Sequence, residues 1–184
     1  YQKVLLLRKH GIERSEDMFS EEKRIGPWKY EMEALGFNYR ITDFQAALGL
    51  SQLKKLGRFM SRRREIVNYY NENFSGIEEL ILPYEDENVV SNFHLYILQV
   101  NDNSRFDRYD LFKHLQNLNY APMVHYIPLH LLGYYKKRYG FKRGDFPVAE
   151  KFYDRTISIP LYPSLTDAEM EKVVEDIKHF VESR

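Results

Sequence analysis

A helical repeat of apolar residues between residues 44 and 74 constrains the fold of this chain more than any other feature. The helix has a defined start, because Thr42 and Gln45 form a capping box and Asp43 complements the helix dipole. Gly57 is the weak point, since an interior glycine costs roughly 1 kcal/mol relative to alanine. We expect two nearly continuous helices, or one bent at Gly57, long enough to bridge two domains. The apolar positions follow helical spacing: Phe44, Ala47, Leu48, Leu50, Leu53, Leu56, Phe59, Met60, Ile66, Val67, Tyr70 and Phe74.

After residue 76 the apolar pattern changes between strand and helix several times. A second capping box, Thr166 with Glu169, begins a C-terminal amphipathic helix. The other predicted elements are a strand at 92–100, a helix at 105–118, a strand at 123–126, a helix at 148–155 and an extended segment at 157–159 that Pro160 ends. This order predicts a small α+β domain, and we place its boundary near Gly76, which gives domains at 1–75 and 76–184.

The N-terminal part is less regular. Residues 1–9 are too few to decide between a strand and a helix, and Gly11 ends that segment. Residues 12–24 are charged and aperiodic, which predicts an exposed loop. Residues 28–32 alternate like a short strand, which would place Trp28, Tyr30 and Met32 on one face.

Charge balance and the absence of cysteine exclude several classes of function. Lysine plus arginine and aspartate plus glutamate both number 27, so no net field favours nucleic acid or an anionic membrane surface. Without cysteine there are no disulfides and no thiolate chemistry, which is compatible with a cytoplasmic protein. No apolar run approaches the roughly 20 residues needed to cross a bilayer. The consecutive arginines at 62–64 would point in different directions on a helix, so we interpret them as a solvated face.

Asn38, Tyr39 and Arg40 form a polar loop just before the capped helix. The Asn38 amide can donate to a phosphate oxygen, although an asparagine here can also close a turn. Arg40 can pair with a phosphate or, in a salt bridge, with a carboxylate. Tyr39 can pack at an interface between subunits. The loop is therefore a candidate anion site with structural alternatives.

His125, Tyr126 and His130 are the candidates of the second half. Pro128 separates the two histidines and no carboxylate lies nearby in the sequence, so we expect no metal site. A histidine at a strand end is also commonly satisfied by a backbone carbonyl. Trp28 and Tyr30 present aromatic faces that can stack on a base, with packing in a core or interface as the alternative.

Four segments of the chain resemble the DegT/DnrJ/EryC1/StrS aminotransferases. They are residues 36–53 (GFNYRITDFQAALGLSQL), 62–66 (RRREI), 124–130 (VHYIPLH) and 158–163 (SIPLYP). Residues 26–36 (GPWKYEMEALG) are most similar to the members that act as UDP-4-amino-4,6-dideoxy-N-acetyl-altrosamine transaminases in pseudaminic acid biosynthesis. The resemblance spans nearly the whole chain but corresponds only to the C-terminal half of such an enzyme.

The resemblance implies a fold, a cofactor and a set of contacts. The fold would be the C-terminal part of a fold-type I enzyme that uses pyridoxal 5'-phosphate (PLP), with a long bridging helix and a small domain with a short, mostly antiparallel sheet. Family members are cytoplasmic homodimers with shared active sites, and they transfer an amino group from glutamate to a nucleotide-linked keto-sugar, here a UDP-linked 4-keto-6-deoxy sugar. In this scheme Asn38 and Arg40 contact the PLP phosphate of the partner subunit. The substrate-binding residues would be Trp28, Tyr30, Tyr39, His125, Tyr126 and His130.

The lysine that the family uses to hold PLP has no counterpart in this sequence. The family places it just before a Thr-Thr-Gly-Glu-Gly-Gly-like motif, and Lys3, Lys9, Lys29 and Lys54 all have other sequence contexts. We therefore expect no catalytic residue in this chain, and we interpret it as a C-terminal fragment that is inactive and binds no PLP alone. The alternative is a stand-alone, non-catalytic module that binds a sugar nucleotide or a protein.

Overall fold

The computed structural model describes residues 1–14 and 26–184. They form two compact units, Tyr1–Lys55 and Leu56–Arg184, each of which is described by itself. The exposed loop predicted for residues 12–24 lies outside the described residues except at its start, where Ile12–Glu13 form strand β1. The predicted domain boundary near Gly76 stays a prediction.

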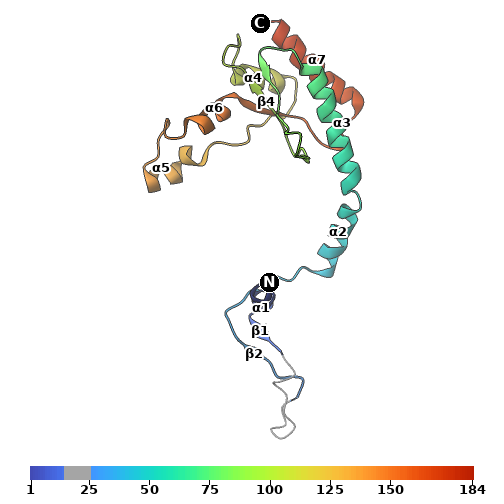
Figure 1. The fold of residues 1–184 in the computed structure, drawn as a ribbon, viewed down its shortest axis with the longest axis vertical. Coiled ribbons are helices and arrows are strands. Elements are labelled where there is room, and N and C mark those ends of the chain that lie inside the picture. Colours follow the sequence, from blue (N-terminus) through green and yellow to red (C-terminus); the bar gives the residue numbers. More distant parts are fainter. Residues whose placement is uncertain (15–25) are drawn as a thin grey trace. The chain divides into compact units, whose positions relative to one another are not determined.

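The described residues of the first unit form two short strands and two helices (Figure 1). Helix α1 spans Gln2–Leu7, and strand β1 pairs antiparallel with β2, Glu31–Met32. The strand predicted for residues 28–32 is therefore only two residues long. It starts late because the Lys29 amide closes a turn on the Gly26 carbonyl at 3.0 Å, and this turn contains Trp28.

The capped helix begins where the sequence predicts. Helix α2 spans Asp43–Leu53, and the Thr42 hydroxyl accepts from the Gln45 amide at 3.3 Å. Helix α3 spans Leu56–Phe74, so the predicted pair of nearly continuous helices is confirmed. The break lies at Lys54–Lys55 rather than at Gly57, because the Lys55 amide bonds to Gln52 in a tightened turn. Gly57 is the second residue of α3. The amide groups of the first turn have no partner within the helix, so a glycine there does not break the helix.

The second unit is built on one antiparallel sheet with strand order β3-β4-β5. Strand β3 spans Leu80–Ile81, β4 Tyr96–Val100 and β5 Thr156–Ile159, with Leu98 opposite Ile157. The helices are α4 (Arg108–Asn117), the 3₁₀ turn η2 (Leu129–Leu131), α5 (Gly133–Tyr139), α6 (Pro147–Arg155) and α7 (Asp167–Glu182). The predicted helix at 148–155, extended segment at 157–159 and capped C-terminal helix are confirmed, as is the α+β class with a short antiparallel sheet.

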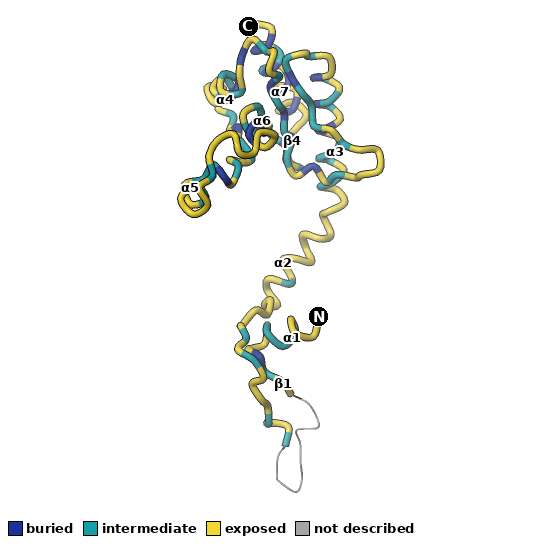
Figure 2. Tube along the Cα trace, turned by 60° about the vertical axis from the view of Figure 1, so that its left-hand side comes forward, coloured by how far each residue is buried: buried dark blue, intermediate teal, exposed yellow. Residues whose placement is uncertain are grey.

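The hydrophobic core lies in the second unit, between the sheet and helices α3, α4 and α7 (Figure 2). Strand β4 buries alternate residues, as a strand with one inward face does. The rings of Tyr70 and Tyr96 meet edge to face with centroids 5.1 Å apart. By contrast, α2 buries none of its residues in the described structure. The side chains that are almost fully buried are Ile66, Val67, Tyr70, Phe74, Tyr96, Leu98, Leu111, Leu115, Ile157, Val173, Ile177 and Phe180.

Three predicted elements differ in extent from the observed ones. The strand predicted at 92–100 starts only at Tyr96, because Phe93 has a positive φ of 42° that interrupts extended backbone. The helix predicted at 105–118 starts at Arg108, after a capping box formed by Asp107 and Asp110. The strand predicted at 123–126 is reduced to an isolated bridge between Met123 and Ser158.

The arginines at 62–64 are not a solvated face, contrary to the prediction. Arg62 donates to the Asp167 carboxylate at 2.6 Å, and Arg63 donates to the carbonyls of Phe93, His94 and Leu161 at 3.1–3.2 Å. Arg64 forms two hydrogen bonds with the Glu85 carboxylate. These partners lie far along the chain, at the start of α7 and on loops, so three consecutive arginines tie α3 to the rest of its unit. No helix in the described parts of the chain is long and apolar enough to span a membrane.

Candidate functional site

The loop at residues 36–40 is held against the end of α1 by backbone contacts. The Phe37 amide donates to the Leu7 carbonyl at 2.6 Å, and the Tyr39 amide donates to the Arg8 carbonyl at 3.1 Å. Gly36 is required here, because a Cβ atom at this position would lie 2.1 Å from the Gly11 nitrogen. The backbone of the loop is therefore held in place against the end of α1.

Asn38, Tyr39 and Arg40 are all exposed in this loop. Asn38 pairs with Lys9 in an isolated β-bridge, and its side-chain amide makes no hydrogen bond with any described residue. The alternative of an asparagine that closes a turn is thus not realised within those residues. The Tyr39 ring is 73% exposed and stacks on Phe37, with centroids 4.9 Å apart. The Asn38 amide is therefore available to a ligand.

A cation-lined cavity of about 910 Å³ adjoins this loop in the first unit. Lys3, Lys9, Arg14 and Arg40 contribute positive charge to its lining, and the only acidic side chain among the described lining residues is Glu13. Such a lining suits an anion, and phosphate groups are the anions that arginine and lysine bind best in proteins. Trp28 and Tyr30 also belong to this unit, with exposures of 70% and 49%, and the Arg14 guanidinium lies 5.4 Å from the Tyr30 ring centroid.

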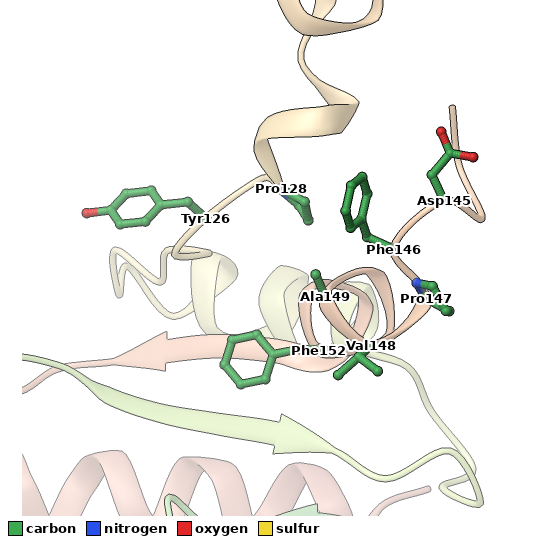
Figure 3. A pocket seen from close by; sticks show the side chains of 8 residues that line it. All are labelled: Tyr126, Pro128, Asp145, Phe146, Pro147, Val148, Ala149 and Phe152. Carbon is green, nitrogen blue, oxygen red and sulfur yellow. The ribbon is translucent and has the colours of Figure 1, made fainter. Parts of the chain in front are cut away.

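In the second unit, His125 and Tyr126 follow directly on the bridge to β5. The His125 Nδ1 atom lies 2.8 Å from the Ser158 hydroxyl, and its ring meets Tyr126 edge to face at 4.6 Å. Tyr126 is 73% exposed and lines a cavity of about 710 Å³ together with Pro128, Phe146 and Phe152 (Figure 3). This cavity has apolar walls and one exposed phenol at its edge.

The only carboxylate among the lining residues of this cavity does not face it. Figure 3 shows the Asp145 side chain pointing away from Ala149 and Phe152. Its Oδ2 atom accepts a hydrogen bond from the Lys142 amide at 2.9 Å, so Asp145 closes a turn. The cavity therefore suits an uncharged, flat or aliphatic group of a ligand.

His130 lies in a buried pair with Glu150, and each residue is only 6% exposed. Its Nε2 atom lies 2.7 Å from the Glu150 Oε1 atom. Glu150 also accepts hydrogen bonds from the Gly144 amide at 2.8 Å and the Phe146 amide at 3.3 Å. Burial acts to raise the pKa of the Glu150 carboxyl, but these hydrogen bonds and His130 outweigh it, so that the pKa lies below its ordinary value.

Sequence reasoning missed Glu150 and Ser158. They lie 20 and 33 residues from their histidines, and no local spacing rule connects residues so far apart. A backbone carbonyl was the expected partner of each histidine. Instead, a side-chain carboxylate binds His130 and a side-chain hydroxyl binds His125. In the part of the chain that the structure describes, no three histidine or carboxylate side chains lie close enough to hold a metal ion.

Comparison with known proteins identifies the family. The model of the DegT/DnrJ/EryC1/StrS aminotransferase family matches residues 1–178. The chain belongs to this family. Spore coat polysaccharide biosynthesis protein SpsC of Bacillus subtilis is 37% identical over 97% of this chain and 46% of its own length. The UDP-4-amino-4,6-dideoxy-N-acetyl-beta-L-altrosamine transaminase of Campylobacter jejuni (strain NCTC 11168) is 33% identical over 92% of this chain and 43% of its own.

A solved sugar aminotransferase has the same fold. Spr1654 of Streptococcus pneumoniae, assigned as a sugar aminotransferase and solved in its PMP-form, is 31% identical and superposes with a TM-score of 0.85 over 100% of this chain and 45% of its own. The predicted family and the predicted fold-type I class are thus confirmed. The chain spans about half the length of the curated relatives it matches.

The residues of the first unit fit the phosphate end of PLP, the cofactor of this family. A phosphate needs hydrogen-bond donors and positive charge, and Asn38 and Arg40 offer both beside the cation-lined cavity. Neither side chain is engaged by a salt bridge with another described residue. This donor set suits a phosphate, and it contains no lysine in the family's PLP-binding sequence context.

Proposed function

We propose that the complete protein containing this chain is a nucleotide-sugar aminotransferase that moves an amino group from glutamate to a keto-sugar. The observation that carries the proposal is the fixed loop at 36–40, which presents Asn38 and Arg40 beside a cavity lined by cations. When bound, PLP supplies the electron sink that makes the transfer of the amino group possible. The residues of this chain bind and orient ligands around it.

Asn38 and Arg40 would hold the cofactor phosphate of a partner subunit in a homodimer. The Asn38 side-chain amide would donate to a phosphate oxygen, and the Arg40 guanidinium would neutralise its charge. Gly36 supports both, because the close backbone approach it allows fixes the loop before α2 begins. Family membership and the exposure of the two side chains support this assignment.

The substrate-side groups would be His125 and Tyr126, with Trp28, Tyr30 and Tyr39 as exposed aromatic faces. Aromatic rings stack on nucleobases of any sequence, so Trp28 or Tyr30 can bind the base of a UDP-sugar. A UDP-linked 4-keto-6-deoxy sugar is the substrate we infer, because the Campylobacter jejuni relative is a transaminase named for a UDP-linked dideoxy sugar.

His130 would contribute to the substrate site through its contact with Glu150 and not by touching the substrate directly. The pair holds Phe146, whose ring lies 4.7 Å from the imidazole and lines the cavity beside Tyr126. Glu150 engages the His130 Nε2 atom, and His130 is only 6% exposed. We therefore assign His130 a positioning role in the wall of the cavity.

The 184 residues alone are proposed to be inactive, since none of their lysines has the sequence context of the PLP-binding lysine. The complete protein with PLP should aminate a UDP-4-keto sugar with glutamate as donor, and these residues alone should not. Failure of the complete protein to aminate UDP-, GDP- or dTDP-linked keto-sugars would reject the function. Activity with one of the other nucleotides would change only the substrate.

The cofactor contact has a direct test in Asn38→Ala. In the complete protein, loss of a hydrogen bond to a charged phosphate should weaken PLP binding roughly 10- to 100-fold. The control is Asn68→Ala, since Asn68 is exposed on α3 and has no side-chain hydrogen bond with the described residues. PLP affinity, measured by absorbance titration, that is equal in the two variants would contradict the assignment.

A further inference from the structure

Ser158 is a fixed, buried hydroxyl beside a candidate substrate-binding histidine. It lies on β5, is 6% exposed, and pairs with Ile97 of β4 on one side of the strand. On the other side its amide donates to the Met123 carbonyl at 2.7 Å, and the Met123 amide returns a bond at 3.3 Å. Because the sheet holds Ser158 from both sides, its backbone cannot shift to suit a ligand.

The same bridge fixes His125, two residues after Met123. The residue is partly buried, its Nδ1 atom lies 2.8 Å from the Ser158 hydroxyl, and its ring meets the Tyr126 ring edge to face. No described residue forms a hydrogen bond with its Nε2 atom. The ring therefore has one nitrogen bound inside the protein and one left for a ligand.

Counting protons decides which nitrogen of neutral His125 carries the hydrogen. A serine hydroxyl has one proton to donate, and a neutral imidazole has one N–H donor and one acceptor nitrogen. Among the described residues, His125 is the only side-chain partner of the Ser158 hydroxyl. If Nδ1 carried the proton, the buried serine proton would have no acceptor, which proteins avoid. The satisfied arrangement has Ser158 donating to Nδ1 and the imidazole proton on Nε2.

We propose that Ser158 is a positioning residue that holds His125 as the Nε2–H tautomer, so that Nε2 donates a hydrogen bond to an oxygen of the sugar nucleotide. The step toward substrate rests on the proposed function, whereas the tautomer itself does not. A fixed N–H donor selects a ligand atom with a lone pair, which is a carbonyl, hydroxyl or phosphate oxygen. It disfavours an ammonium group at the same place.

The first experiment reads the tautomer without any activity. Nitrogen-15 NMR of the imidazole rings in the 184-residue chain, assigned with a His125→Gln variant, should show Nδ1 unprotonated and Nε2 protonated. Ser158→Ala should shift the Nδ1 resonance, and Ser158→Thr, which keeps a hydroxyl, should restore it. The matched control is Thr156→Val on the same strand, because the Thr156 hydroxyl is buried without a described partner. It should leave His125 unchanged.

An Nδ1–H tautomer in the unmodified chain, or an unchanged spectrum in Ser158→Ala, overturns the proposal. The second experiment uses the complete enzyme. Ser158→Ala should raise KM for the sugar nucleotide about tenfold, with kcat and the KM for glutamate nearly unchanged, as expected for one lost binding contact. In a His125→Ala background the same substitution should add nothing.

The two experiments separate the two proposals. If the tautomer is found but the complete protein aminates no keto-sugar, the positioning of His125 stands and the proposed function fails. If the enzyme is active but Ser158→Ala leaves KM unchanged, the function stands and the substrate contact of His125 is rejected. Far-UV circular dichroism of each variant checks that the loss of the hydroxyl has not unfolded β5.

Discussion

Removing the hydroxyl of Tyr70 tests how α3 is tied to the segment that follows β5. The side chain is fully buried, and its hydroxyl donates to the Pro160 carbonyl at 2.9 Å. Burial raises the pKa of Tyr70, so the hydroxyl keeps its proton and stays a donor at neutral pH. Tyr70→Phe keeps the ring and its edge-to-face contact with Tyr96, and removes only this hydrogen bond.

The expected cost follows from what remains after the substitution. The Pro160 carbonyl loses its donor in a partly buried place, which costs about 1–2 kcal/mol of unfolding free energy. With a urea m-value of about 1–3 kcal/mol/M for a small protein, the midpoint of unfolding should fall by roughly 0.3–2 M. Urea unfolding of the 184-residue chain, followed by far-UV circular dichroism, measures this shift.

The matched control is Tyr69→Phe, one residue earlier on the same helix. Tyr69 is partly buried, and its hydroxyl forms no hydrogen bond with the described residues. Its removal should change the unfolding free energy by less than about 0.5 kcal/mol. If the two variants unfold at the same urea concentration, the bond to Pro160 contributes nothing and the reasoning is refuted.

Two further predictions concern a helix cap and acid sensitivity. Thr166→Ala should lower the unfolding free energy by about 1 kcal/mol, because it removes the capping box of α7, whereas Thr42→Ala affects only the other unit. Equal urea midpoints for the Leu56–Arg184 transition in both variants would contradict this. In the folded protein the pKa of the Glu150 carboxyl lies below its ordinary value of 4.5. The ionised carboxylate therefore stabilises the folded state above that pH, and this contribution is lost as the pH falls through the folded pKa. Glu150→Gln should therefore flatten the fall of the urea midpoint between about pH 5 and about pH 3, and an unchanged slope would count against the buried pair.

Local rules predicted the helices well and the strands poorly. Capping boxes and helical spacing act between residues three or four apart, so the starts of α2 and α7 could be read directly. The strand predicted at 123–126 failed because a strand exists only through its partner. Of residues 123–126 only Met123 pairs with β5, at Ser158, and the chain then leaves the sheet toward Pro128.

For the candidate site, the sequence named the residues but not their neighbours. The loop at 36–40 and the pair His125–Tyr126 were chosen from motifs, and the structure presents Asn38, Arg40 and Tyr126 as exposed side chains. The cation-lined cavity combines residues from the stretch 2–14 with Ala34 and Arg40, which no spacing argument would group. A cavity is a property of packed surfaces, so its lining becomes visible only when the chain is folded.

By itself, the sequence determined the family, the α+β class and the capped helices, because motifs, composition and helix signals are encoded within a few residues of one another. Only the tertiary structure decided what the polar side chains do. It bonded the arginines at 62–64 to distant loops and to the start of α7, paired His130 with Glu150, and placed Ser158 against His125. The physical reason is that a buried polar group must find a partner in space, and the chain that supplies it can be any number of residues away.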